Sequence, residues 1–207
     1  MFEEHEAKFF IAEVVLAIEY IHTLDVIYRD MKPENILVDY DGHIKLADFG
    51  LAKEGIADSK TAKSFCGSPA YLAPEMLFNK GAGKSADIYQ IGACLYEMLI
   101  GFPPFYTENI KKLYDDIKSA KLKIPSYVSP QAKDLLQKLL NKNPNLRIGV
   151  KDKSEIKRHP FFKGIDWDLL MAKKIAPPLI LKLDREEEDD EESAYLVSFV
   201  WVTLRKL

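Results

Sequence analysis

The chain has 207 residues, of which 47% are hydrophobic, so it is long enough for one sizeable core and favours a single globular domain. Its net charge is −3, but the seven acids in the run from Glu186 to Glu192 contribute −7, and the rest of the chain therefore carries +4. No lysine or arginine block is dense enough to predict nucleic-acid binding, and the longest uncharged apolar run, 194–204, is far shorter than the ~20 residues of a membrane span.

Residues 2–22 are predicted to form an amphipathic helix. Phe10, Val14 and Ile18 recur at helical spacing, together with Ile11 and Val15. The other side of the predicted helix carries four acids: Glu3, Glu6, Glu13 and Glu19. This pattern indicates a helix that packs on a core.

The next elements are two short β-prone stretches, 36–39 and 43–46. They flank Asp41 and Gly42, which can supply the positive φ values of a tight turn. The pattern predicts a small hairpin directly after the polar octapeptide "YRDMKPEN" at 28–35.

Residues 50–84 show little periodicity, so we expect a long ordered loop there, and long loops within domains are usually functional. Ser85 is predicted to cap the helix "ADIYQIGACLYEMLI", which is apolar on nearly all sides and should form the buried axis. Gly101 and Pro103 should end it. Further helices are predicted at about 107–120 and at 130–141, the latter capped by Ser129, and the fold is expected to be mainly α.

The chemistry-bearing residues lie on either side of the predicted hairpin. Asp30, Lys32 and Asn35 precede it, and Asp48 opens the "DFG" tripeptide that follows it, so the hairpin should bring both loops together. Asp48 and Asn35 offer oxygen ligands to a hard cation such as Mg²⁺, which binds one or two carboxylates together with substrate phosphates. Asp30 is then free for a different role.

The order Arg-Asp-x-Lys-Pro-Glu-Asn, hairpin, Asp-Phe-Gly and then "APE" at 73–75 resembles the protein-kinase signature. The resemblance covers about residues 5–165 and extends through "ADIYQIGACLYEMLIGFPPF", "NPNLRIG" and "RHPFF". Tyr28 before Arg-Asp, together with "GHIKLADFGLAKE" and "SFCGSPAYLAPE", resembles the AGC group of serine/threonine kinases. It implies a mainly α fold like the C-terminal lobe of a kinase, with a small β-hairpin.

The resemblance implies a role for each residue of the signature. Asp30 would accept the proton of the substrate hydroxyl, and Lys32, typical of serine/threonine kinases, would touch the ATP γ-phosphate. Asn35 and Asp48 would hold Mg²⁺, whose charge offsets that of the transferred phosphoryl group. A solvated turn acid, a surface lysine and caps of turns are the structural alternatives.

The segment after the hairpin carries an implied phosphorylation site. Ser64 matches the phosphorylated position of AGC kinases, for which an upstream activating kinase is expected, and Arg29 and Lys53 match the cations that receive the phosphate. An ordinary loop hydroxyl is the alternative for Ser64. Ser68 would bridge Asp30 and Lys32.

Substrate-binding residues are also implied. Phe65, Pro69 and Leu72 resemble the pocket for the residue after the phosphoacceptor. Glu34 and Glu97 match positions that bind arginines of basic substrates. Structural roles are implied for three further residues. Glu75 and Arg147 would form an ion pair, and Asp87 would brace the backbone of the octapeptide 28–35. None of the histidines has a spacing typical of a metal site.

Parts of the kinase signature are missing from the sequence. It contains no glycine-rich loop and no Val-Ala-Ile-Lys strand, so the smaller β-rich lobe is expected to be absent. Because that lobe supplies half of the phosphate-binding groups, ATP binding should be weak. The missing lobe should also leave an apolar patch beside Phe49. Residues 1–165 are predicted to form the larger lobe of the kinase domain. Residues 166–207 are predicted to be an AGC-like extension with the acidic run, solvated, and an atypical end.

Three functions from different classes fit these observations. The first is an ATP- and Mg²⁺-dependent serine/threonine kinase acting on basic protein substrates, represented by a truncated domain. The second is an inactive kinase-like scaffold, and the third is an unrelated Mg²⁺ phosphohydrolase. The two cysteines, Cys66 and Cys94, do not have the spacing of metal ligands, and the sequence shows no signal peptide. Both observations favour a cytosolic or nuclear setting.

Overall fold

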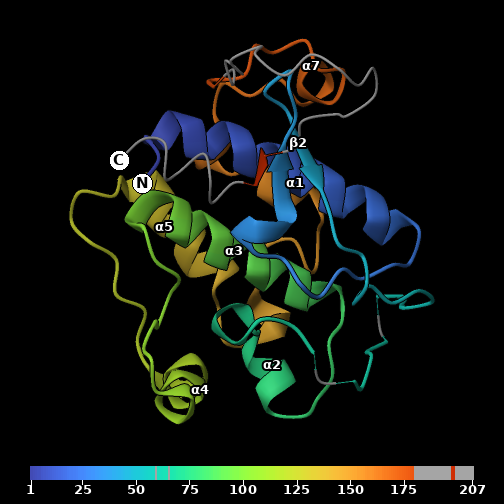
Figure 1. Cartoon of the computed structure of the whole chain (residues 1–207), viewed down its shortest axis with the longest axis vertical. Helices are drawn as coiled ribbons and strands as arrows, with labels where there is room; N and C mark the ends of the chain where they lie inside the picture. Colours follow the sequence, from blue (N-terminus) through green and yellow to red (C-terminus); the bar gives the residue numbers. More distant parts are fainter. Residues whose placement is uncertain (59, 65, 180–196, 199–207) are drawn as a thin grey trace, which may run out of the picture.

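The computed structural model describes residues 1–58, 60–64, 66–179 and 197–198, and it is mainly helical, as predicted. At its centre α3 (Lys84–Ile100) packs against α1 (Glu4–Thr23) on one side and against α5 (Pro130–Leu139) on another (Figure 1). The shorter helices are α2 (Pro74–Leu77), α4 (Ile110–Ser119), α6 (Ser154–Lys157) and α7 (Trp167–Met171), with 3₁₀ turns η1 (Pro33–Asn35), η2 (Pro69–Tyr71), η3 (Pro144–Leu146) and η4 (Pro160–Phe162).

Helix α3 is the buried axis of the molecule, which confirms the prediction from its all-round apolar sequence. Gly92 allows α5 to approach closely, because a Cβ at this position would lie 2.7 Å from the Leu139 Cβ. Gly101 ends the helix in the left-handed region, with φ 98°. The predicted cap was wrong: Gly83 is the N-cap, and Ser85 lies inside the first turn.

Helix α1 is buried on more sides than its sequence pattern indicates. The sequence pattern placed Glu6 and Glu13 on the side away from the core. Both are instead buried, with exposed fractions of 7% and 9%. The Glu13 carboxylate accepts hydrogen bonds from the Ile44 backbone N–H at 2.9 Å and contacts the His43 Nδ1 at 2.5 Å. Burial raises the pKa of Glu13. A buried acid therefore joins α1 to the hairpin.

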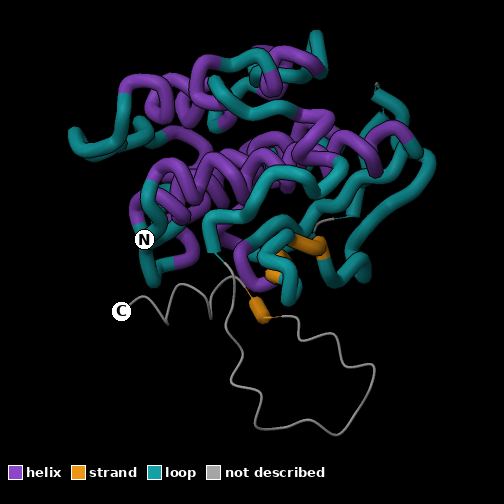
Figure 2. Tube along the Cα trace, turned by 90° about the horizontal axis from the view of Figure 1, so that it is seen from above, coloured by secondary structure: helices purple, strands orange, loops and turns teal. Residues whose placement is uncertain are grey.

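The predicted hairpin is present. Strand β1 (Ile36–Val38) pairs antiparallel with β2 (Ile44–Leu46), with Ile36 opposite Leu46. The turn differs in detail, since Gly42 alone of the predicted pair has a positive φ, at 82°. A third strand that the sequence did not predict, β3 (Val197–Ser198), pairs with the other edge of β1 and gives the order β2-β1-β3 (Figure 2).

The remaining elements mostly match their predictions. Helices α4 and α5 lie within the predicted ranges, and the Ser129 hydroxyl accepts a hydrogen bond from the Ala132 N–H at 3.1 Å. The segment 50–84 is mostly irregular, although it contains η2 and α2. None of the helices in the described ranges has the length and hydropathy to cross a membrane. The acidic run lies outside the described residues, so the division at residue 165 stays a prediction.

One buried polar atom generates a prediction about stability. Among the described residues, the Tyr89 hydroxyl is the buried side-chain oxygen without a hydrogen-bond partner. Because an unsatisfied buried hydroxyl costs ~1–3 kcal/mol, we expect Tyr89→Phe to raise the free energy of unfolding by about 1 kcal/mol or more in urea titrations.

The matched control is Tyr96→Phe. Tyr96 is also buried, but its hydroxyl donates to the Lys123 carbonyl at 2.7 Å. The control should lower the free energy of unfolding by about 1 kcal/mol. Equal losses in both variants would show that the Tyr89 hydroxyl is satisfied in solution.

Candidate active site

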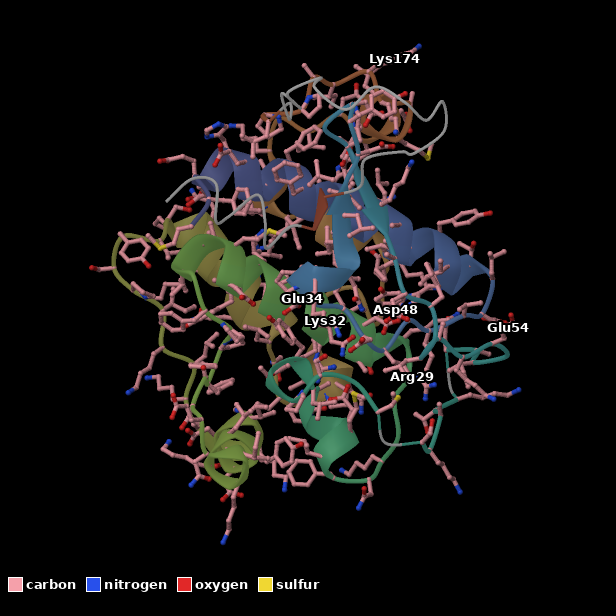
Figure 3. All side chains as sticks on the ribbon, viewed as in Figure 1. Arg29, Lys32, Glu34, Asp48, Glu54 and Lys174 are labelled. Carbon is pink, nitrogen blue, oxygen red and sulfur yellow. The ribbon has the colours of Figure 1, made fainter. Side chains whose placement is uncertain are left out.

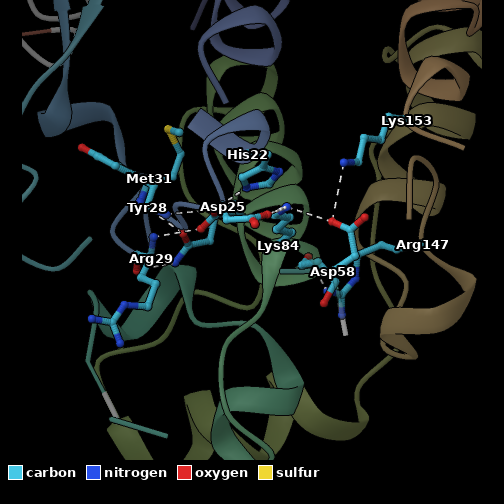
Figure 4. Close-up of polar contacts among 12 residues, drawn as sticks. His22, Asp25, Tyr28, Arg29, Met31, Asp58, Lys84, Arg147 and Lys153 are labelled. Atoms are coloured by element: carbon cyan, nitrogen blue, oxygen red, sulfur yellow. Dashed lines mark hydrogen bonds and ion pairs between the residues drawn. The ribbon is translucent and has the colours of Figure 1, made fainter. Parts of the chain in front are cut away.

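The polar octapeptide 28–35, called the catalytic loop from here on, is anchored to α3 by two side chains. Asp87, fully buried, accepts hydrogen bonds from the backbone N–H groups of Tyr28 (2.9 Å) and Arg29 (2.8 Å). Figure 4 shows these contacts together with that of His22. The His22 Nε2 lies 2.7 Å from Asp87 Oδ2, the oxygen that also accepts from the Tyr28 N–H. The predicted brace is confirmed.

Gln90, one turn further along α3, completes the anchor. Its amide donates to the Arg29 carbonyl at 3.0 Å and accepts from the Met31 N–H at 3.2 Å. Arg29 has φ 72°, in the left-handed region that costs a non-glycine residue free energy. Hydrogen bonds on both its N–H and its carbonyl fix this conformation, which turns the chain toward Asp30.

The Asp30 carboxylate is 5% exposed and is held by three neighbouring side chains. Its Oδ1 accepts from both the N–H and the hydroxyl of Ser68, each at 3.1 Å. Its Oδ2 lies 3.0 Å from the Lys32 Nζ and 3.1 Å from the Asn35 Nδ2. Lys32 also donates to the Ser68 hydroxyl at 3.1 Å, so Ser68 touches both residues that it was expected to bridge.

Asn35 and Asp48 are brought into neighbouring loops by the hairpin. The Ala47 N–H donates to the Asn35 carbonyl at 2.9 Å, which places Asp48 one residue from this link. In the view of Figure 3, Asp48 lies close to Lys32. Asp48 is exposed with φ 54°, and its Oδ1 accepts from the Gly50 N–H at 3.1 Å.

This donor set fits a Mg²⁺ ion. Both N–H bonds of the Asn35 amide go to Asp30, at its carbonyl and at Oδ2, which leaves the Asn35 amide oxygen as the ligand end. Asp48 adds an exposed carboxylate. No cluster of three His, Cys, Asp or Glu residues able to hold a metal occurs in the described ranges, so substrate phosphates and water would complete the shell.

Arg29 also reaches the predicted phosphorylation site. Its guanidinium donates to the Leu51 carbonyl at 2.6 Å and to the hydroxyl of the exposed Ser64 at 2.5 Å. Lys53 lies nearby because its backbone pairs with Ile27 at 2.9 Å in both directions. The Lys53 side chain is exposed and, in the described part of the chain, has no hydrogen bond to Ser64.

The two candidate acids for basic substrates are electrostatically coupled. Glu34 is exposed on η1, while Glu97 on α3 is half-buried and accepts a hydrogen bond from the Tyr71 hydroxyl at 2.5 Å. Burial raises the pKa of Glu97, the Tyr71 hydrogen bond opposes this rise, and the negative charge of Glu34 adds to it.

The predicted apolar pocket is described only in part. Leu72 is fully buried and Pro69, at the start of η2, is exposed. Phe65 lies outside the described residues. The structure therefore places two of the three residues in one short segment next to Ser68.

Phe49 of the "DFG" tripeptide is 47% exposed. Its ring packs edge-on against Tyr28, with centroids 5.1 Å apart. It lines a groove of about 600 Å³ between α1, β2 and α7, whose apolar lining includes Leu16, Tyr20, Leu46 and Met171. The expected apolar patch beside Phe49 is present.

The predicted Glu75–Arg147 ion pair is confirmed. The two guanidinium nitrogens, Nη1 and Nη2, donate to the two Glu75 oxygens at 2.6 and 2.8 Å, and Arg147 is 2% exposed. Arg147 also donates to the Ser85 carbonyl at 2.6 Å and the Asn141 carbonyl at 2.9 Å. The pair ties α2 to the start of α3 and to η3.

Sequence analysis missed three residues that shape the site: His22, Tyr71 and Gln90. Gln90 could have been found, because a lone amide inside an otherwise apolar helix needs buried partners. His22 and Tyr71 gave no comparable signal, since their partners Asp87 and Glu97 are 65 and 26 residues away.

The fold and this constellation define a protein kinase domain. The family model described as "Protein kinase domain" matches residues 1–162, and the chain belongs to this family. The expected AGC-type serine/threonine kinase relationship is confirmed by its relatives. Membership of this family excludes the unrelated phosphohydrolase.

The chain is 51% identical over 177 residues to serine/threonine-protein kinase gad8 of Schizosaccharomyces pombe, a match covering 86% of this chain and 31% of that protein. It is 49% identical over 172 residues to serine/threonine-protein kinase YPK2/YKR2 of Saccharomyces cerevisiae, covering 83% and 25%. It is 47% identical over 180 residues to the RAC family serine/threonine-protein kinase homolog of Dictyostelium discoideum, covering 86% and 40%. The chain thus spans a quarter to two fifths of the length of these curated relatives.

The Glu75–Arg147 pair generates a stability prediction. Glu75→Gln leaves a buried guanidinium without its counter-charge, so we expect it to lower the free energy of unfolding by ~3–5 kcal/mol, measured by denaturant titration. Glu75→Leu combined with Arg147→Met removes both charges and should recover most of this loss. A double variant less stable than Glu75→Gln would contradict this account of the pair.

Proposed function

We propose that the protein carrying this chain is a serine/threonine kinase that transfers the γ-phosphate of ATP to protein substrates. The observation that carries the proposal is the Asp30 carboxylate, which Lys32, Asn35 and Ser68 hold in one orientation beside the hairpin loops. Phosphoryl transfer depends mostly on the positioning of the reacting groups and on charge stabilisation. The contacts of Asp30 provide the positioning.

Each residue of the site has one task in this proposal. Asp30 orients the substrate hydroxyl and accepts its proton, while Lys32, 3.0 Å from Asp30, offers its ammonium group to the γ-phosphate. The Asn35 amide oxygen and the Asp48 carboxylate would hold Mg²⁺. The ion supplies positive charge that offsets the charge on the transferred group.

The proposed substrates are basic around the phosphoacceptor. Glu34 and Glu97 supply two carboxylates that can pair with substrate arginines, and Arg–carboxylate pairs are strong because they can be bidentate. Pro69 and Leu72 would contact the residue after the phosphoacceptor, together with Phe65.

Ser64 is the proposed activating phosphosite, modified by an upstream kinase. Its hydroxyl already accepts a hydrogen bond from Arg29 at 2.5 Å, and the backbone of Lys53, the second expected cation, pairs with Ile27, two residues before Arg29. A phosphate there would gain charge-assisted hydrogen bonds and stabilise the segment that carries Ser68.

Cys66 and Cys94 are free thiols, which supports a cytosolic or nuclear setting for the protein.

The second candidate is an inactive scaffold that only binds kinase substrates. A binding module has no chemical need for the contacts among Asp30, Lys32 and Asn35. Their presence favours the catalytic proposal. The exposed acids Glu34 and Asp48 fit either candidate.

The test measures transfer of labelled γ-phosphate to an arginine-rich serine peptide with Mg²⁺. Because ATP binding is expected to be weak, we expect slow transfer by the chain, and we expect Asp30→Asn to lower this rate about a hundredfold or more, since a general base contributes ~10²–10⁴-fold. Asp115→Asn, at an exposed acid on α4, is the control and should keep the wild-type rate. Peptide binding without transfer would support the scaffold instead.

The Glu97 environment predicts a pH dependence of peptide binding. Only the ionised carboxylate attracts arginine, and burial raises the Glu97 pKa, so binding should weaken as pH falls, from above the ordinary glutamate value of 4.5. Tyr71→Phe removes a hydrogen bond that lowers this pKa, so the midpoint should move to higher pH. Peptide titrations by fluorescence anisotropy between pH 4 and 8 measure both midpoints. A midpoint that moves down in Tyr71→Phe would contradict this assignment.

A further inference from the structure

A cavity of about 320 Å³ lies between α1, α3, α6 and the segment that leads to Ser64. Its apolar wall consists of six valine and isoleucine side chains from the three helices and from the loop before α6: Val15, Ile18, Ile88, Ile91, Val150 and Ile156. No residue of the catalytic loop lines this cavity. It is therefore a feature separate from the candidate active site, and it is called the lysine-rimmed cavity from here on.

The size and the wall of the cavity limit the class of ligand that it can take. Small-molecule pockets have volumes of ~300–1,000 Å³, so this cavity suits a small ligand. The described residues that line it include no Phe, Tyr or Trp, so an aromatic ligand would find no such ring to stack on. The branched aliphatic wall instead favours a flexible alkyl chain, whose methylene groups gain free energy from burial alone.

The charged residues that line the cavity are mixed, with four lysines, Lys60, Lys80, Lys84 and Lys153, and three acids, Glu19, Asp58 and Glu75. Two of the acids are neutralised from outside the cavity. Arg147 binds the Glu75 carboxylate, and the Lys157 Nζ lies 2.8 Å from the Glu19 Oε2. Asp58 is then the acid that remains to balance the four lysines.

Two of the lysines already have carboxylate partners. The buried Lys84 lies between Asp25 and Asp58, with its Nζ 2.7 and 2.9 Å from their oxygens, and the Lys153 Nζ lies 3.5 Å from Asp58 (Figure 4). Lys60 and Lys80 are exposed, and neither forms an ion pair with a carboxylate in the described ranges. Their ammonium groups are thus available to an anion.

We propose that the lysine-rimmed cavity binds an aliphatic carboxylate, with the alkyl chain against the valine and isoleucine wall and the carboxylate at Lys60 and Lys80. Most of the affinity comes from the alkyl chain, because ion pairs between exposed groups contribute little. The bound molecule also contacts the segment of Asp58 and Thr61, which ends three residues before Ser64. The proposal goes beyond the proposed kinase function, since this binding requires neither ATP nor a peptide.

The ligand class is tested by isothermal titration calorimetry of the full chain with butyrate, hexanoate, octanoate and octanol, below the concentrations at which micelles form. We expect the affinity to rise about fourfold for each added methylene group, or about fifteenfold from hexanoate to octanoate. Octanol should bind about two- to fivefold more weakly than octanoate. Undetectable binding of octanoate, or equal affinity for octanol and octanoate, would overturn the proposal.

The position of the ligand is tested in the unaltered chain by nuclear magnetic resonance of ¹³C-labelled isoleucine δ1-methyl groups. Octanoate should shift the signals of the four isoleucines of the cavity wall: Ile18, Ile88, Ile91 and Ile156. Ile21 and Ile44 line the groove beside Phe49 and should keep their signals. Shifts at Ile21 and Ile44 instead would place the alkyl chain in that groove and overturn the proposal.

A substitution that fills the cavity provides a second test of the position. Val150 is half-buried in the wall, so Val150→Phe should lower the octanoate affinity about tenfold or more. The matched control is Leu16→Phe, at a half-buried residue of the groove beside Phe49, and it should keep the wild-type affinity. The reverse result would overturn the proposal. If Val150→Phe fails to fold, the methyl signals of the unaltered chain still decide the position.

The role of the lysines is tested with a double variant, Lys60→Gln with Lys80→Gln. It should lower the octanoate affinity about two- to fivefold and leave the octanol affinity unchanged. The control, Lys111→Gln with Lys133→Gln, removes the same charge at exposed positions on α4 and α5 and should bind both ligands as the wild type does. Equal losses of octanoate affinity in the two double variants, or none in either, would overturn the assignment of the carboxylate to Lys60 and Lys80.

Discussion

A buried carboxylate on the central helix determines the shape of the candidate site. Asp87 binds the backbone N–H groups of Tyr28 and Arg29, and Gln90, one turn along α3, binds the carbonyl of Arg29 and the N–H of Met31. A left-handed arginine is unfavourable unless its surroundings compensate, and these bonds compensate at both of its peptide groups. Because α3 is buried along most of its length, Asp87 and Gln90 are held in place and fix the backbone of the loop that carries Asp30.

The same arrangement joins the loop to the rest of the site. From this anchored backbone, the Arg29 side chain reaches Leu51 and Ser64, and the Tyr28 ring packs against Phe49. The "DFG" tripeptide and the Ser64 segment therefore share a support with Asp30. The proposed phosphorylation of Ser64 would therefore change the charge on a segment that already contacts the catalytic loop through Arg29.

Much of the fold could be predicted from the sequence, because its signals are local. The helical periodicity of 2–22, the apolar helix ended by Gly101 and the β-prone stretches around Gly42 all gave elements that are present. The helical pattern failed for Glu6 and Glu13, because a pattern of this kind places charged residues on the solvent-exposed face. It holds no information on His43 and the Ile44 N–H, which contact Glu13 from 30 and 31 residues away. Strand β3 was not predictable either, because strand pairing joins residues about 160 positions apart and leaves no periodic signal at either end.

The Glu75–Arg147 pair also constrains the order of events during synthesis. Its partners are 72 residues apart, and Asp87 follows Tyr28 by 59 residues. On the ribosome, where the chain is made from its N-terminus, the catalytic loop emerges well before α3, and the end of the Ser64 segment emerges well before Arg147. The residues of the catalytic loop are thus made well before Asp87 and Gln90, which fix its backbone. A nascent chain of this sequence acquires a formed site only when nearly the whole helical domain is available to fold.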